Sequence, residues 1–207
     1  MKKLASLSIL VCLVCTSPHV LAQTCSLGAD IDLKVDYFRL SDSNFRHTAD
    51  GDGVYVGLSM YKQLFVPNLY FGMEAGWAGA SGTVTNRGGF SFDNDVNYVL
   101  VEFNTKYVIP ISRCFNFDFG AGISANYLDV TVNSYGRSWD DSKWLFGGQF
   151  FAEANYKIKN FFTGIDVKYQ LTEDTHLFGE TLLFGNHPYS GTSADNLRVG
   201  AHAGFYF

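Results

Sequence analysis

The chain has 207 residues, of which 47% are hydrophobic and 16% aromatic, and its formal net charge is −5. This acidic balance argues against a nucleic-acid-binding protein, which needs a basic surface. No long apolar run follows the N-terminal segment, which excludes transmembrane helices. Many aromatic and glycine residues without a heptad repeat favour an all-β protein.

Residues 1–22 have the pattern of a secretory signal peptide. Two lysines precede the apolar segment 4–15, and Val20-Leu21-Ala22 supplies small residues at the cleavage site. This apolar segment is too short to span a bilayer as a helix. We therefore predict a signal peptide over 1–22 and one β-barrel domain over 23–207. A lipoprotein signal ending at Cys15 is the alternative, although a valine precedes this cysteine where a small residue is usual.

Eight segments of the predicted domain alternate between apolar residues and polar or small residues, which is the pattern of strands with two different faces. The predicted strands cover 29–40, 54–65, 69–78, 96–108, 115–127, 144–158, 161–171 and 196–207. The clearest is 115–127, where every odd position is apolar and every even position is small or polar. Phe151 breaks the pattern, because it falls on the polar side of its strand.

The connections between these strands alternate between short and long. The short ones are 66–68, 109–114 and 159–160. The long ones are 41–53, 79–95, 128–143 and 172–195. Aromatic residues gather near the strand ends, where two interfacial girdles are expected. We predict an eight-stranded antiparallel up-and-down transmembrane β-barrel in the bacterial outer membrane, with both termini on the short-turn side. A soluble β-sandwich or lipocalin-like barrel is the alternative.

The last strand ends in Ala203-Gly204-Phe205-Tyr206-Phe207. With this ending, the chain resembles the small eight-stranded outer-membrane barrels of the OmpX and OmpA barrel-domain type. The resemblance covers the whole predicted domain as architecture. It implies contact with outer-membrane lipid and an assembly signal at Gly204, Phe205 and Phe207, read by the barrel-assembly machinery. The sequence departs from full-length OmpA because no peptidoglycan-binding domain follows the last strand, so no wall-anchoring role is expected.

The polar face of the strands is predicted to line an interior that is only wide enough for side chains. The charged or titratable residues predicted to point inward are Asp32, Lys34, Glu74, Glu102, Lys106, Asp118, Glu153, Asp166, Lys168, Arg198 and His202. Buried charges must pair or meet water, so we expect an ion-pair network that fills the lumen. The alternative is a narrow pore, which the excess of carboxylates would make cation-preferring.

A lipid A-modifying enzyme is a further alternative on this architecture. A deacylase needs a histidine followed closely by a serine, but His202 is predicted to point inward and no serine follows it. A palmitoyl-transfer site would use His47 with Ser41 or Ser43. The segment Asp50-Gly51-Asp52-Gly53 lacks the spacing of a calcium-binding EF-hand loop. We therefore predict no catalytic residues, no metal and no cofactor.

Cys25 and Cys114 are both predicted at the periplasmic end, where an oxidising compartment permits a disulfide between them. The long loops 41–53, 79–95, 128–143 and 172–195 are predicted to face the outside and to contact an extracellular or host ligand. The predicted function is therefore a non-enzymatic one, structural or in surface interaction.

Overall fold

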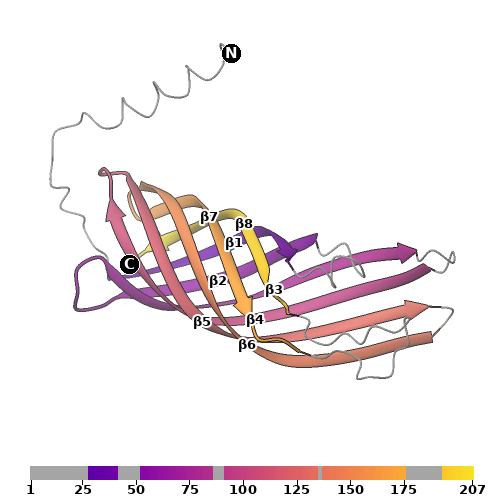
Figure 1. Ribbon diagram of the computed structural model, residues 1–207. Helices are drawn as coiled ribbons and strands as arrows, with labels where there is room; N and C mark the ends of the chain where they lie inside the picture. The colour runs from indigo at the N-terminus through magenta and orange to yellow at the C-terminus, as the bar shows by residue number, and fades with distance from the viewer. Residues whose placement is uncertain (1–27, 42–51, 86–90, 135–136, 176–192) are drawn as a thin grey trace, which may run out of the picture.

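The computed structural model describes residues 28–41, 52–85, 91–134, 137–175 and 193–207. Its eight strands are β1 (Ala29–Leu40), β2 (Asp52–Gln63), β3 (Leu69–Thr85), β4 (Ser91–Pro110), β5 (Phe115–Ser134), β6 (Arg137–Ile158), β7 (Phe161–Thr172) and β8 (Asn196–Tyr206). Each strand pairs antiparallel with the next, and β8 pairs with β1 to close the barrel (Figure 1). The predicted fold is confirmed. Within the described residues, no helix is long and apolar enough to cross a membrane.

The outer face of the barrel carries a belt of exposed apolar side chains. Leu33 is 54% exposed, Ile123 67% and Ile165 66%, although all three are large aliphatic residues. Aromatic residues lie at both ends of the belt. Tyr127 and Trp144 pack together at the long-loop end, with ring centroids 5.4 Å apart. A closed barrel leaves no unpaired sheet edge inside the bilayer, so this belt is a surface for lipid.

Two predicted loops are wrong, because the chain continues as strands through most of 79–95 and 128–143. β3 extends to Thr85 and β4 begins at Ser91, while β5 extends to Ser134 and β6 begins at Arg137. The reason is that the apolar residues move from the outward face to the inward face of the sheet where the strands extend beyond the apolar belt. Its outward residues become polar and its inward residues become apolar, as in a sheet exposed to water on one side.

The predicted loops 41–53 and 172–195 lie largely outside the described residues. At their described ends, Asp52 and Gly53 belong to β2, and Thr172 is the last residue of β7. The loop boundaries there were therefore wrong by one or two residues. The proposed acyl-transfer pair cannot be placed, because His47 and Ser43 fall outside the described residues.

Four strands, β3 to β6, continue well past the rest of the barrel (Figure 1). The pairing of β2 with β3 ends at Gly53 and Ala80, and the pairing of β6 with β7 ends at Gly147 and Thr172. Beyond these points the four strands remain paired with one another. We call residues 81–85, 91–95, 129–134 and 137–146 the projecting sheet.

Candidate functional site: the barrel interior

Four charged side chains meet at the centre of the barrel. Glu74 on β3 and Glu102 on β4 are register partners, as are Lys168 on β7 and Arg198 on β8. The register therefore sets two carboxylates beside each other, facing two cations on the other wall. Lys168 Nζ lies 2.7 Å from Glu74 and 2.6 Å from Glu102, and Arg198 forms ion pairs with both. Each carboxylate thus forms ion pairs with both Lys168 and Arg198, and all four side chains are at most 1% exposed.

A second group of ion pairs lies on the short-turn side of this centre. Lys34 connects the two groups, because its Nζ is 2.6 Å from Glu153 and 3.4 Å from Glu74. Lys106 Nζ lies between 3.5 and 3.7 Å from Glu153, Asp30 and Asp118. The structure thus joins most of the predicted inward charges into one buried network.

His202 has an acceptor at each of its ring nitrogens. Nδ1 lies 3.0 Å from Asp166 and Nε2 lies 2.6 Å from the side-chain oxygen of Asn155. The Asn155 amide is oriented by its nitrogen, which donates to Asp118 at 3.1 Å. An oxygen thus faces each ring nitrogen, so Asp166 and Asn155 together fix the orientation of the ring. The ring is buried, and among the described residues no serine hydroxyl is hydrogen-bonded to it.

Aromatic rings pack against the buried cations. Lys106 Nζ lies 4.0 Å from the ring centroid of Tyr61, and the Arg198 guanidinium lies 4.5 Å from that of Tyr55. Tyr55 also donates a hydrogen bond to Glu74 at 2.8 Å. Phe151, which seemed misplaced in the sequence, lies inside the barrel 5.1 Å from Lys168 Nζ. Its ring covers Gly120, where any side chain would collide with it.

Several interior residues were missing from the predicted list of inward residues. Asp30, Asp36, Tyr55 and Tyr61 are all buried. Strand parity already placed all four on the inward face, so this signal was present in the sequence. Asp32 is held by Ser59, whose hydroxyl donates to it at 2.5 Å. Neither carboxylate oxygen of Asp36 has a hydrogen-bond partner among the described residues.

The interior changes character toward the long-loop end, where apolar side chains fill it. This apolar plug consists of Phe38, Leu40, Tyr55, Ala78, Ala80, Val96, Tyr98, Leu100, Leu128, Val130, Leu145 and Ala194, with Val132 packed against it. Apart from Ala80, Val96, Val130 and Val132, its members are at most 1% exposed. A path along the barrel axis would have to cross both the ion pairs and this apolar layer.

Side-chain amides and hydroxyls form a third kind of contact, along the wall from β4 to β8. Gln149 donates to Asn104 at 2.7 Å, and Gln170 donates to Ser124 at the same distance. Asn196 in turn donates to the oxygen of Gln170 at 2.7 Å. The first two bonds connect β4 with β6 and β5 with β7, strands that the backbone ladder does not pair directly, so they add stiffness across the wall.

The carboxylates of the interior outnumber the basic groups. The buried acids among the described residues are Asp30, Asp32, Asp36, Glu74, Glu102, Asp118, Glu153 and Asp166, whereas the buried bases are Lys34, Lys106, Lys168, Arg198 and His202. No group of three or more metal-ligating side chains that could hold a metal occurs in the part of the chain that the structure describes.

The predicted disulfide stays a prediction. Cys114 is exposed in the turn between β4 and β5, whereas Cys25 lies outside the described residues.

In the predicted assembly signal, Phe205 packs against Phe161 with ring centroids 5.4 Å apart, and Phe207 is 65% exposed. A side chain at Gly204 would collide with Asp32 and Phe162 inside the barrel.

A closed eight-stranded barrel with an apolar outer belt and a charged interior has the architecture of the small bacterial outer-membrane barrels. No protein-family model matches the sequence, and no curated protein matches it. Among solved structures, the chain is similar to Neisserial surface protein A, with a TM-score of 0.58 at 13% identity over 87% of this chain and 97% of that one.

Two further solved structures have the same fold. Ail, the attachment invasion locus protein of Yersinia pestis, has a TM-score of 0.50 at 16% identity over 86% of this chain and 99% of its own. A major outer membrane protein of Thermus thermophilus has the same TM-score at 14% identity, over the same shares of the two chains. The apolar belt and this shared fold locate the protein in the bacterial outer membrane.

Proposed function

We propose that this protein is a non-enzymatic scaffold of the outer membrane, which holds the projecting sheet rigidly outside the lipid for contact with an extracellular partner. One observation carries the proposal: the interior is filled by ion pairs and the apolar plug, while four strands continue beyond the barrel. A filled interior argues for rigidity rather than transport. Strands that continue past the lipid provide a surface for contact.

The charge on the projecting sheet favours a basic partner. Asp93, Asp95 and Asp140 are exposed there, whereas Lys143 is the exposed basic residue among the side chains of the sheet whose exposure the structure describes. One side of β6 is an edge of the sheet, because β7 does not follow it beyond Gly147. Sheet edges accept extended segments of other proteins. The predicted ligand-binding loops 79–95 and 128–143 thus contribute mostly strands to this surface.

Two narrower roles belong to the same proposal. The signal peptide over 1–22 would direct the chain to export. Gly204, Phe205 and Phe207 would then be read by the barrel-assembly machinery as the last strand enters the membrane. Two observations support this role of the last strand: Gly204 packs inside the barrel, and the aromatic side chain of Phe207 is exposed on the outside.

The contact role is tested by removing most of the projecting sheet. Because Ala80 pairs with Val96 and Val130 pairs with Asp141, residues 81–95 and 131–140 can each be replaced by an Asn-Gly turn without changing the register. Bacteria that display the trimmed barrel should lose adherence to cultured epithelial cells, while the barrel still folds. Equal adherence of the folded trimmed and untrimmed proteins would refute the contact role.

The filled interior predicts that the protein does not conduct ions. In a planar bilayer, the folded protein should give no steady channel current under conditions where a general porin, inserted in the same bilayer, conducts. The apolar plug is the reason, because an ion would have to shed its hydration to cross it. A steady cation-selective current would instead support the narrow pore.

Mass analysis of lipid A from cells with and without the protein tests the enzymatic alternative, and unchanged lipid A is expected.

A further inference from the structure

At the short-turn end of the barrel, apolar side chains are exposed in the connecting turns and at a strand end. In the β2–β3 turn, Leu64 is 41% exposed, Phe65 fully exposed and Val66 53% exposed. Ile111 in the β4–β5 turn is 53% exposed and Ile158 at the end of β6 is 52% exposed. Two separate turns and the end of β6 therefore present apolar groups at the same end of the barrel, which is unusual for a surface that faces water.

The β2–β3 turn is held in a defined shape. Leu64 and Leu69 are joined by a backbone hydrogen bond of 2.8 Å, and the Leu69 amide also lies 3.2 Å from the Val66 carbonyl. Asn68 has a φ of 64°, the left-handed conformation that a tight turn needs. Its carbonyl accepts a 2.9 Å bond from Val108 on β4. Phe65 is thus presented outward by a turn anchored to two strands.

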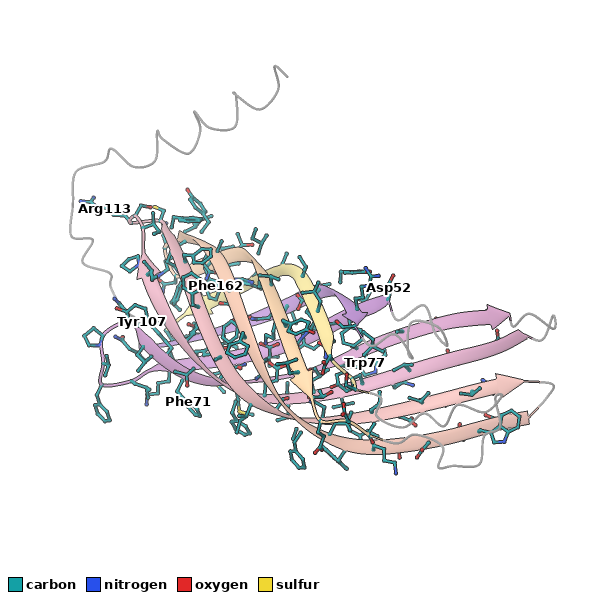
Figure 2. The ribbon with its side chains drawn as sticks, in the orientation of Figure 1. Asp52, Phe71, Trp77, Tyr107, Arg113 and Phe162 are labelled. Atoms are coloured by element: carbon teal, nitrogen blue, oxygen red, sulfur yellow. The ribbon has the colours of Figure 1, made fainter. Side chains whose placement is uncertain are left out.

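The exposed charges at this end are basic. Lys62 lies on the lipid-facing side of β2, Arg113 lies in the β4–β5 turn and Lys159 lies in the β6–β7 turn. No exposed Asp or Glu side chain occurs at the short-turn end within the described residues. The long-loop end has the opposite character, with Asp52, Asp93, Asp95 and Asp140 exposed. Figure 2 shows Arg113 and Asp52 at opposite ends of the barrel.

From these observations we propose that the short-turn end is a binding surface for anionic phospholipid. The turn 64–67 inserts into the leaflet on that side. Lys62 beside this turn, and Arg113 and Lys159 in the two other turns of the same barrel end, bind phosphate groups. The surface is continuous with the lipid belt, because Phe71 and Tyr107 are exposed on β3 and β4 at this end of the barrel, where Tyr107 is the register partner of Leu69 (Figure 2). Apolar anchors flanked by basic side chains are the composition of an interfacial lipid-binding site.

The proposal rests on the placement of the barrel in a bilayer, and it goes beyond the contact role of the projecting sheet at the other end. Each basic group near an anionic surface contributes about 1 kcal/mol, which is about fivefold in an equilibrium constant. Three such groups are expected to raise the folded-to-unfolded ratio by up to about a hundredfold in vesicles that contain phosphatidylglycerol, compared with phosphatidylcholine alone.

The first experiment measures this ratio by urea-induced unfolding in both kinds of vesicle. In phosphatidylglycerol vesicles, the triple variant Lys62→Gln/Arg113→Gln/Lys159→Gln should lose most of the increase in the folded-to-unfolded ratio. For the unmodified protein, 0.5 M salt should reduce the same increase. The matched control Arg39→Gln/Lys143→Gln removes two basic groups at the long-loop end and should keep the full gain. Equal ratios in the two vesicles, or an equal loss in the control, would overturn the proposal.

A second experiment tests insertion of the turn. Phe65→Cys, in a Cys25→Ser/Cys114→Ser background, carries an environment-sensitive dye. Its emission should be that of a dye in lipid, and a lipid-resident nitroxide should quench it. The same dye at Asp95→Cys should emit as in water. Water-like emission at position 65 would overturn insertion, and so would displacement of the dye from lipid by soluble peptidoglycan fragments, which would mark a site for an anionic polymer.

Discussion

Replacing Arg198 by methionine is expected to lower the free energy of unfolding by about 3–5 kcal/mol, the usual cost of leaving a buried charge without its partner. Arg198 forms ion pairs with Glu74 and Glu102 and packs on the ring of Tyr55. In the Arg198→Met variant, Glu102 keeps only Lys168 as an ion-pair partner among the described residues, and Glu74 keeps Lys168 and the more distant Lys34. The measurement is urea-induced unfolding of the protein in lipid vesicles.

Two companion variants separate the buried network from surface charge. Arg39→Met removes an arginine whose partner, Asp52, lies 3.5 Å away, but both side chains are more than 40% exposed. An exposed pair contributes at most about 1 kcal/mol, so this change should be nearly silent. Adding Glu102→Gln to Arg198→Met should recover part of the loss, because it restores the local charge balance. A loss below about 1 kcal/mol for Arg198→Met would contradict a structural role for the network.

Placing an arginine on the lipid-facing side is expected to destabilise the barrel by about 2–4 kcal/mol when the position is near the middle of the bilayer. Ile165 meets this condition, because it is 66% exposed and lies midway along β7 between the aromatic residues Phe161 and Tyr169. The expected loss for Ile165→Arg comes from taking a charge into hydrocarbon. Guanidinium-induced unfolding in vesicles measures it.

The matched control for this change is Leu171→Arg, on the same face of the same strand but near its long-loop end. Leu171 is 47% exposed, so the two sites differ mainly in depth. Near the interface the cost falls to about 0–1 kcal/mol. Equal and small effects at both positions would indicate that the exposed face of β7 meets water, as it does in the soluble-barrel alternative.

The sequence was sufficient to predict the barrel wherever one strand face meets lipid. There, alternation identified the strands closely, and β1 matches its predicted bounds, 29–40. The extensions of β3 to β6 were missed because alternation was expected to keep its apolar face outward. Past the lipid the outside is water, so Val130 and Val132 turn inward while Asp129 and Thr131 face out. The signal that could have shown this lies at Tyr127: up to this residue the odd positions are apolar, and after it the even positions are apolar.

The interior was predicted in kind but not in its contacts. Parity placed Glu74, Glu102, Lys168 and Arg198 inside, but neighbouring strands alone give only the like-charged pairs. The opposite charges meet across the barrel, between strands far apart in sequence, and that depends on the shear of the closed sheet. Phe151 looked like an error for a similar reason, because the space it fills is left by Gly120 on the next strand.

The most direct test of this account is a depth profile along the outward face of β5. In a Cys25→Ser/Cys114→Ser background, single cysteines at positions 119, 121, 123, 125, 127, 129, 131 and 133 carry a bimane label in vesicles. A lipid-resident nitroxide should quench the label from 119 to 127, and aqueous iodide should quench it from 129 onward. Iodide quenching along the whole strand would contradict a barrel that stands in lipid and projects its sheet beyond it.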